Sequence, residues 1–158
     1  MSIKFTIIIT AEKKERYILE TIKSCLKQSL LRKFRIIVVY SKLNNEKLVK
    51  NRFLDLKNLI FLKCPLKKIS PTNDQLFKIE MATKFLKDEW VLLLDGDDLF
   101  LEKKLKTLQT LNLNKNKVYL HDHQIITGKT LSNSTKHKNY KKLFLYKFLF
   151  NDWPEKIN

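Results

Sequence analysis

Residues 90–98, WVLLLDGDD, hold the most informative feature of this sequence. The apolar run from Trp90 to Leu94 predicts a strand buried on both faces, as in a parallel sheet covered by helices. It ends in three carboxylates within four positions, Asp95, Asp97 and Asp98. Open α/β sheets bind their ligands at the carboxyl ends of the strands. We therefore expect these acidic residues to lie where such a sheet binds its ligand.

Carboxylates this close in sequence repel one another unless a cation or hydrogen-bond donors hold them together. Mg²⁺ or Mn²⁺, itself bridging phosphate oxygens, is a natural partner. Two plainer interpretations compete: Asp-Gly is typical of a tight turn, and Asp97 or Asp98 is a suitable N-cap for a helix beginning near Leu99. An EF-hand calcium loop is excluded, because its fifth, sixth and twelfth positions counted from Asp95 hold Leu, Phe and Lys.

The size and composition indicate one globular domain. The chain has 158 residues and a hydrophobic content of 44%, enough to bury a core. It has no run of about 20 apolar residues, and the apolar stretch in MSIKFTIIIT is too short for a signal peptide. Cys25 and Cys64 show no metal-binding spacing, so we expect buried free thiols in a reducing cytosol.

The chain is strongly basic, with a net charge of +16. This charge favours contact with polyanions, such as anionic lipids, phosphorylated substrates or nucleic acids. Of the 32 basic residues, only those at positions 16, 32, 35 and 52 are Arg, the residue suited to bidentate recognition. Lysines are spread over the whole chain. A lysine-rich nucleic-acid binder is therefore the weakest interpretation, and we expect no specific nucleic-acid partner.

Strand-like and helix-like segments alternate along the chain. Apolar, β-branched runs predict strands at residues 4–10, 34–40, 59–63 and 90–94. Apolar residues at helical spacing predict helices at about residues 15–29, 45–56, 74–86 and 103–111. Residues 118–127 contain two short strand-like pieces. This order predicts an α/β protein with three layers, α/β/α, around a mostly parallel sheet.

Three phrases of the sequence resemble family 2 glycosyltransferases of the GT-A fold. FTIIITAEKKERYILETIKSCLKQSL is similar to that family's opening strand, loop and first helix. IIVVYSKLNN lies where the family has its second strand and an Asp-rich turn, and LKDEWVLLLDGDD resembles the strand that delivers the DxD motif. The resemblance covers roughly the first 125 residues. It implies a nucleotide-diphospho-sugar transferase-like domain over residues 1–135, followed by a separate C-terminal segment, residues 136–158.

The resemblance implies a transferase that uses a nucleotide-sugar donor held through a divalent metal, Mn²⁺ or Mg²⁺. Asp97 would be the principal metal ligand, Asp95 would contact the donor ribose or the water shell of the metal, and Asp98 would support them. The metal would neutralise the departing diphosphate. A hydroxyl of a glycan or lipid-linked acceptor would then attack the anomeric carbon, assisted by a carboxylate base.

The chain departs from the family pattern around the donor. Thr10, Ala11 and Glu12 stand where the family usually has a Pro-Thr-Tyr-Asn-like segment, so the resemblance places them beside the donor. Tyr40 and Ser41 replace the acid that reads the nucleobase. A Tyr ring can stack on a base and a Ser hydroxyl can hydrogen-bond it, but neither reproduces a carboxylate.

Two functions of the family, a donor-binding Arg and a catalytic base, have no clear residue in this chain. Lys78 lies nearest to the position of a donor-binding Arg, and it would act as a point charge instead of a fork. No catalytic base is identified, and the acids remaining downstream are Asp122, Asp152 and Glu155. Asp122 stands between two histidines that alternation would place on one face, either as ligands or as ordinary edge-strand residues. An alternative is therefore a GT-A-like binding domain with an incomplete catalytic site.

Residues 136–153, KHKNYKKLFLYKFLFNDW, alternate Lys with Leu, Phe and Tyr. Such a basic aromatic helix either packs on the sheet or lies in a membrane interface with its lysines at the lipid phosphates. We expect peripheral membrane contact through residues 140–153 if the second interpretation holds. The expected location is then the cytoplasm, at the inner face of the membrane.

Overall fold

The computed structural model describes residues 5–12, 17–28, 34–67, 69–87, 89–111 and 113, together with the backbone of 124–127 and 130–133. The chain divides into two compact units between residues 112 and 113. The domain boundary expected near residue 135 lies outside the described residues, as do the two histidines and the basic aromatic segment.

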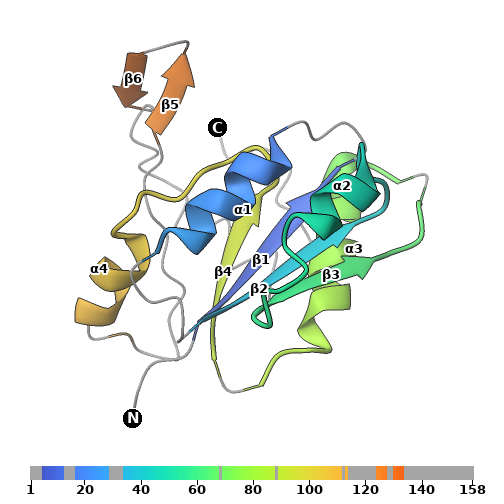
Figure 1. The fold of residues 1–158 in the computed structure, drawn as a ribbon, viewed down its shortest axis with the longest axis horizontal. Helices are drawn as coiled ribbons and strands as arrows, with labels where there is room; N and C mark the ends of the chain where they lie inside the picture. Colours follow the sequence, from blue (N-terminus) through green and yellow to red (C-terminus); the bar gives the residue numbers. More distant parts are fainter. Residues whose placement is uncertain are drawn as a thin grey trace, which may run out of the picture. The chain divides into compact units, whose positions relative to one another are not determined.

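The first unit alternates strands and helices in the predicted order (Figure 1). Its elements are β1 (Phe5–Ala11), α1 (Ile18–Leu26), β2 (Phe34–Tyr40), α2 (Glu46–Asn51), β3 (Leu59–Lys63), α3 (Pro71–Thr83), β4 (Trp90–Asp95) and α4 (Lys104–Thr110). The described part of the second unit is an antiparallel hairpin of β5 (Gln124–Thr127) and β6 (Thr130–Asn133). Strand β5 lies within residues 118–127, where two short strand-like pieces were expected, and residues 118–123 lie outside the described residues.

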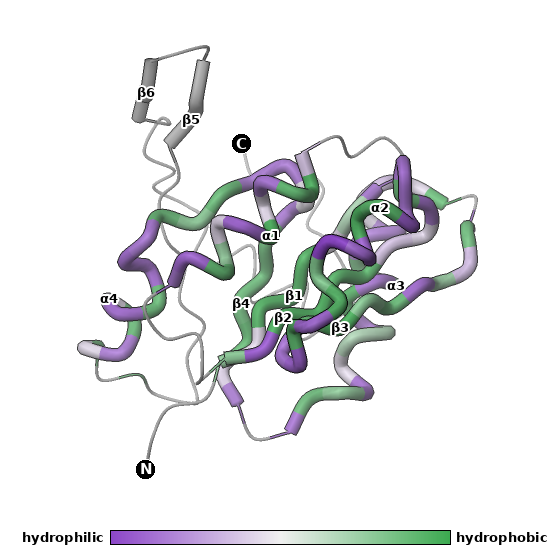
Figure 2. The backbone as a smooth tube through the Cα atoms, viewed as in Figure 1, coloured by the Kyte–Doolittle hydropathy of each residue, from purple (hydrophilic) through white to green (hydrophobic). Residues whose placement is uncertain are grey.

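The four strands of the first unit form one parallel sheet in the order β3-β2-β1-β4. All seven residues of β1 are buried, and six of the seven in β2. Their Ile and Val side chains fill both faces of the sheet, which is typical of a parallel sheet covered on both sides. Figure 2 shows the two central strands as mainly hydrophobic along their length. The predicted α/β class is confirmed.

Helices cover both faces of the sheet (Figure 1). Helix α3 packs on β1 and β2, where Ala82 and Phe77 join a core with Ile8, Ile37 and Val39. Helices α1 and α2 lie on the opposite face. This division follows from right-handed crossovers, because β1–α1–β2–α2–β3 runs across the sheet in one direction and β3–α3–β4 runs back in the other. The predicted three-layer arrangement is confirmed.

Helix boundaries differ from the predicted ones at three helices: α1 spans only Ile18–Leu26 within the predicted 15–29, α2 ends early, and α3 is shifted by three residues. Helix α3 begins at Pro71, three residues before the predicted start, because the Ser70 hydroxyl caps it by accepting a hydrogen bond from the Asn73 N–H at 3.3 Å. Proline is well suited to the first helical position, where its missing N–H is not needed. Helix α2 ends at Asn51, and the chain then turns to enter β3.

The strand order reverses at β1, and this reversal positions the candidate site. Strands β2 and β3 extend from one side of β1, whereas β4 pairs with its other side. The carboxyl ends of β1 and β4 therefore form a topological switch point, the usual ligand-binding crevice of an open α/β sheet. Thr10 and Asp95 are register partners at this edge.

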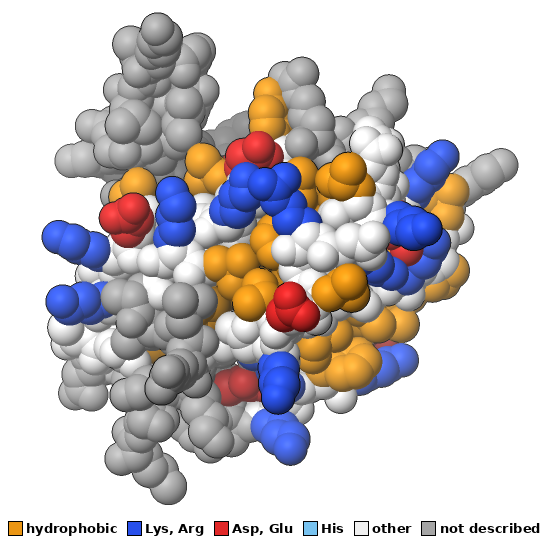
Figure 3. Space-filling model, in the orientation of Figure 1, with side chains coloured by type: hydrophobic (Ala, Val, Ile, Leu, Met, Phe, Trp, Pro, Cys, Tyr) orange, Lys and Arg blue, Asp and Glu red, His pale blue; other side chains and the backbone are white. Residues whose placement is uncertain are grey.

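Both cysteines are free and buried, as expected. Lys and Arg side chains occupy several separate parts of the face seen in Figure 3, in line with their spread along the sequence. None of the helices in the described part of the chain is long and apolar enough to cross a membrane.

Candidate functional site

A cavity of about 310 Å³ opens at the switch point between β1 and β4. Five residues that the sequence placed at a donor or metal site line it together: Thr10, Glu12, Lys78, Asp95 and Asp97. The start of α3 supplies the rest of the wall, through Pro71, Thr72 and Gln75. Residues up to 87 positions apart in the sequence thus meet in one hollow, because parallel strands present their carboxyl ends at the same sheet edge.

Asp95 is held by two neutral donors. The Thr10 hydroxyl donates to Asp95 Oδ1 at 3.2 Å, and the Gln75 side-chain amide donates to the same oxygen. Partial burial raises the pKa of the Asp95 carboxyl, and nearby Asp97 raises it further, against the lowering by these two hydrogen bonds. The protein therefore fixes the orientation of this carboxylate without balancing its charge.

Asp97 lies in a turn that backbone hydrogen bonds hold at the edge of the sheet. The Gly96 N–H donates to the Thr10 carbonyl at 3.0 Å, and the Asp98 N–H donates to the Asp95 carbonyl at 3.1 Å. Asp97 and Asp98 are both exposed, and only Asp97 lines the cavity. The turn interpretation of Asp-Gly is thus correct. The helix-cap interpretation is wrong, because α4 begins only at Lys104.

Helix α3 turns one polar face toward the cavity. Pro71, Gln75 and Lys78 recur at helical spacing, and all three line the wall. The Lys78 side chain is only 1% exposed and forms an ion pair with Asp74. Asp74 Oδ1 is buried without a hydrogen-bond partner among the described residues. Lys78 is therefore at the cavity, as expected, but its charge is taken up by Asp74.

Three other predicted donor residues are buried beside the cavity wall and do not line it. Ala11 and Tyr40 are register partners at the ends of β1 and β2, and both are 0% exposed. The Tyr40 ring therefore has no exposed face for the expected stacking on a base, and its hydroxyl donates to Glu46 at 2.8 Å. The Ser41 oxygen lies 3.6 Å from the sulfur of buried Cys64.

The candidate bases Asp122, Asp152 and Glu155 lie outside the described residues. Sequence reasoning missed Gln75 and Asp74, which look like ordinary solvent-facing positions of an amphipathic helix. A signal was nevertheless present, because Gln75 shares a helical face with Lys78.

The residues at the cavity fit a divalent cation bound together with a diphosphate. Within the described ranges, no group of three His, Cys, Asp or Glu side chains is arranged to hold a metal ion by itself. A complete protein cage is not required, since Mg²⁺ at phosphates is usually bound by one or two carboxylates plus phosphate oxygens and water. Glu12, Asp95 and Asp97 line the same hollow, and Lys78, the one cation among the described lining residues, is already paired with Asp74. The electrostatics therefore favour a cation.

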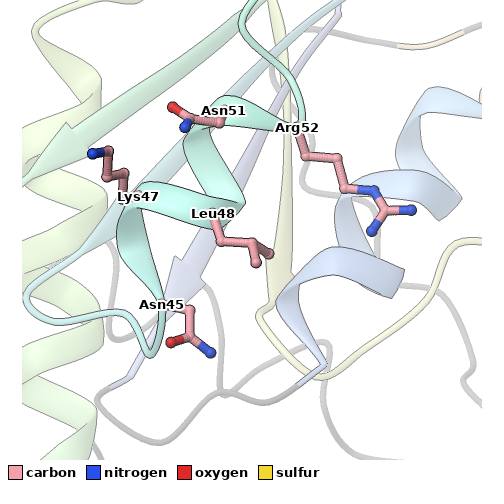
Figure 4. A pocket seen from close by; sticks show the side chains of 5 residues that line it. All are labelled: Asn45, Lys47, Leu48, Asn51 and Arg52. Atoms are coloured by element: carbon pink, nitrogen blue, oxygen red, sulfur yellow. The ribbon is translucent and has the colours of Figure 1, made fainter.

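A second hollow, of about 670 Å³, lies over α2 and has a different character. Its lining residues are Asn45, Lys47, Leu48, Asn51 and Arg52. The two cations diverge, with Lys47 and Arg52 pointing to opposite sides of the helix (Figure 4). No carboxylate lines this surface, and no residue predicted for the site belongs to it. The switch-point cavity is the candidate site.

Comparisons with known proteins agree with this fold. No protein-family model and no curated protein sequence matches the chain. Among solved structures, the fold is similar to residues 1–349 of TarS from S. aureus, with a TM-score of 0.56 and 24% identity over 67% of this chain. The same TarS region in complex with UDP gives the same values.

The chain is also similar to the mannosyltransferase PcManGT from Pyrobaculum calidifontis in complex with GDP-Man and Mn²⁺, with a TM-score of 0.53 and 17% identity over 65% of this chain. The match covers 31% of the TarS 1–349 chain and 30% of the mannosyltransferase. At these identities the likeness establishes the architecture. The first unit of this chain has the GT-A-like α/β fold of these structures.

Proposed function

We propose that this chain binds a nucleoside-diphosphate sugar through a divalent cation at Asp95 and Asp97 and transfers the sugar to a glycan or lipid-linked acceptor. The observation that carries the proposal is the single cavity that gathers Thr10, Glu12, Asp95 and Asp97 at the switch point. The two structural neighbours with UDP or with GDP-Man and Mn²⁺ support the donor class. The sequence resemblance supports assignment to family 2.

The three aspartates would have different roles in binding the donor and its cation. Asp97 is exposed and has no hydrogen bond or ion pair among the described residues, so it is the primary cation ligand. Asp95, fixed by Thr10 and Gln75, would accept a hydrogen bond from a donor hydroxyl or from the water shell of the metal. The bound cation supplies Lewis-acid neutralisation of the leaving diphosphate. Asp98 supports the turn through its backbone hydrogen bond.

Titration calorimetry tests donor binding. Mn²⁺ with a panel of UDP, GDP, ADP and CDP should give metal-dependent binding of at least one nucleotide, lost in Asp97→Asn. Failure of the wild-type chain to bind any of them would refute the proposal. Donor hydrolysis, measured in parallel, separates an enzyme from a chain that only binds the donor.

One observation favours a second candidate, a donor-binding domain without catalytic activity. The three carboxylates among the described lining residues, Glu12, Asp95 and Asp97, are all assigned to the donor or its cation, which leaves none of them to act as a base. Under this alternative the nucleotide binds with the metal, but neither hydrolysis nor transfer occurs. Membrane contact through residues 140–153 at the inner face, with a lipid-linked acceptor there, belongs to the first candidate and is tested by co-sedimentation with anionic vesicles.

A further inference from the structure

Helix α1 and the turn that follows it carry a stripe of polar side chains, Thr21 and Ser24 on the helix and Gln28 just after it, which we call the α1 stripe. The first two bind the backbone of the segment after β4. The Thr21 hydroxyl donates to the Gly96 carbonyl at 2.8 Å, and the Phe100 N–H donates to Ser24 Oγ at 3.0 Å. Their spacing places these side chains on one face of the helix.

Gln28 uses both ends of its side-chain amide on the same segment. Its nitrogen donates to the Leu101 carbonyl at 2.8 Å, and its oxygen accepts from the Leu105 N–H at 3.0 Å. Gln28 and Thr21 are each 0% exposed. The α1 stripe therefore forms hydrogen bonds with four backbone groups of the segment from Gly96 to Leu105.

The α1 stripe supports a segment without regular secondary structure. Residues 98–101 form neither helix nor strand, and the exposed fractions of Leu99 and Leu101 are 47% and 72%. Apolar burial there comes mainly from Phe100, which is 7% exposed. Buried polar side chains are costly unless fully hydrogen-bonded, so a satisfied stripe specifies one arrangement of the segment.

The hydrogen bond from Thr21 holds Gly96, the residue between the two carboxylates at the cavity. Gly96 lies between Asp95 and Asp97, its N–H is bound by the end of β1, and its carbonyl is bound by Thr21. Both sides of this residue are thereby fixed, and with them the directions of the two carboxylates that flank it. Thr21 does not line the cavity.

We propose that the α1 stripe positions Asp95 and Asp97 for the cation, so that residues of α1 set the metal affinity without touching the ligand. This inference rests on the proposed function. Partners that orient metal ligands from outside the coordination sphere typically change metal affinity by about 10–100-fold when removed. We expect about a tenfold effect for Thr21, since the Gly96 N–H and the other stripe residues remain in place.

Two substitutions of one residue test the proposal. Thr21→Val keeps the shape of the side chain and removes the donor, whereas Thr21→Ser keeps the hydroxyl. Calorimetry with Mn²⁺ in the presence of UDP or GDP should show about tenfold weaker binding in Thr21→Val and recovery to within about twofold in Thr21→Ser. Wild-type affinity in Thr21→Val would overturn the proposal.

A control separates positioning from loss of stability. Val49→Ala removes buried apolar atoms from α2, on a helix that carries none of the stripe. At equal folded fraction it should bind as the wild type does. If it weakens binding as much as Thr21→Val, the effect is one of stability and the proposal fails.

Amide hydrogen exchange provides a readout that does not depend on ligand binding. Thr21→Val should speed exchange at Gly96 and Phe100 while leaving β1 and β2 unchanged. If the wild-type chain binds no nucleotide, the proposed function fails, and the exchange result alone decides whether the stripe orders the turn. Unchanged exchange at both amides would overturn that ordering.

Discussion

Two charged clusters lie at the same edge of the sheet, one around Glu46 and one formed by Asp95 and Asp97, and their carboxylates are stabilised in opposite ways. At the ends of β2 and β3, Glu46 accepts a hydrogen bond from the Tyr40 hydroxyl at 2.8 Å and forms ion pairs with Lys50 at 3.0 Å and Lys63 at 2.9 Å. These donors lower the pKa of Glu46 to about 2. The charge of this carboxylate is neutralised by the chain's own cations.

At the ends of β1 and β4, the donors to Asp95 are the neutral groups of Thr10 and Gln75, and its pKa is raised. The nearby cation, Lys78, is paired with Asp74. The cluster around Glu46, which the chain's own cations neutralise, stabilises the fold. The cluster with open charge costs stability and remains available to a ligand, as is common at functional sites.

Breaking the internal pair beside the cavity should have the largest effect on stability. Lys78→Met leaves Asp74 in a largely buried site without its cation, and we expect the free energy of unfolding to fall by about 3 kcal/mol. Urea denaturation measures it. The double variant Asp74→Leu/Lys78→Met removes both charges and should recover most of the loss. An equal loss in both variants would mean that Lys78 stabilises by packing and not by pairing.

Glu46→Gln should lower the free energy of unfolding by about 1 kcal/mol at pH 7, because it weakens a partly exposed network of two ion pairs. Since the folded pKa lies below the ordinary 4.5, the contribution of Glu46 is fully present above pH 4.5 and is lost as the pH falls toward 2. Denaturation of both chains between pH 7 and 2 should therefore show their difference shrinking. A difference that is constant with pH would contradict this cause.

Asp95→Asn should have the smallest effect on stability and the opposite sign. Because the folded pKa is raised, the ionised carboxylate is a cost above that pKa, and the substitution should stabilise the apo chain at pH 7. Solvent screening at this exposed side chain limits the gain to about 0.5 kcal/mol. Thermal unfolding with and without Mn²⁺ measures it. If Asp95→Asn clearly destabilised the chain, the charge of Asp95 would stabilise the fold as that of Glu46 does, and the contrast between the two carboxylates would be wrong.

The fold was largely predictable because its signals are local. The buried β-branched runs at β1 and β2 and the helical spacing in α1 define elements that occur where expected. The start of α3 was predicted three residues late, because apolar spacing does not reveal Pro71, the first residue of a helix capped by Ser70. The end of α2 was missed because apolar spacing continues into the turn at Phe53.

The site was predictable where chemistry is concentrated in the sequence and not where it depends on register. Three acids within four positions drew attention to Asp95 and Asp97, and the structure places both at the cavity; their role in binding stays a prediction. Gln75, Glu46 and Thr21 were missed, since each occupies an ordinary helical position. Their roles arise from partners 20, 6 and 75 residues away, respectively. The burial of Tyr40 follows from its place at the end of β2, between Ala11 of β1 and Lys63 of β3.

The most direct test of the account compares one residue from each cluster. Calorimetry with Mn²⁺ and UDP or GDP should be run on the wild type, Asp97→Asn and Glu46→Gln, each at a pH where all are folded. We predict metal-dependent nucleotide binding in the wild type, its loss in Asp97→Asn and its retention in Glu46→Gln. Equal binding by the wild type and Asp97→Asn, or loss only in Glu46→Gln, would contradict the central claim that the open acidic cluster binds the donor.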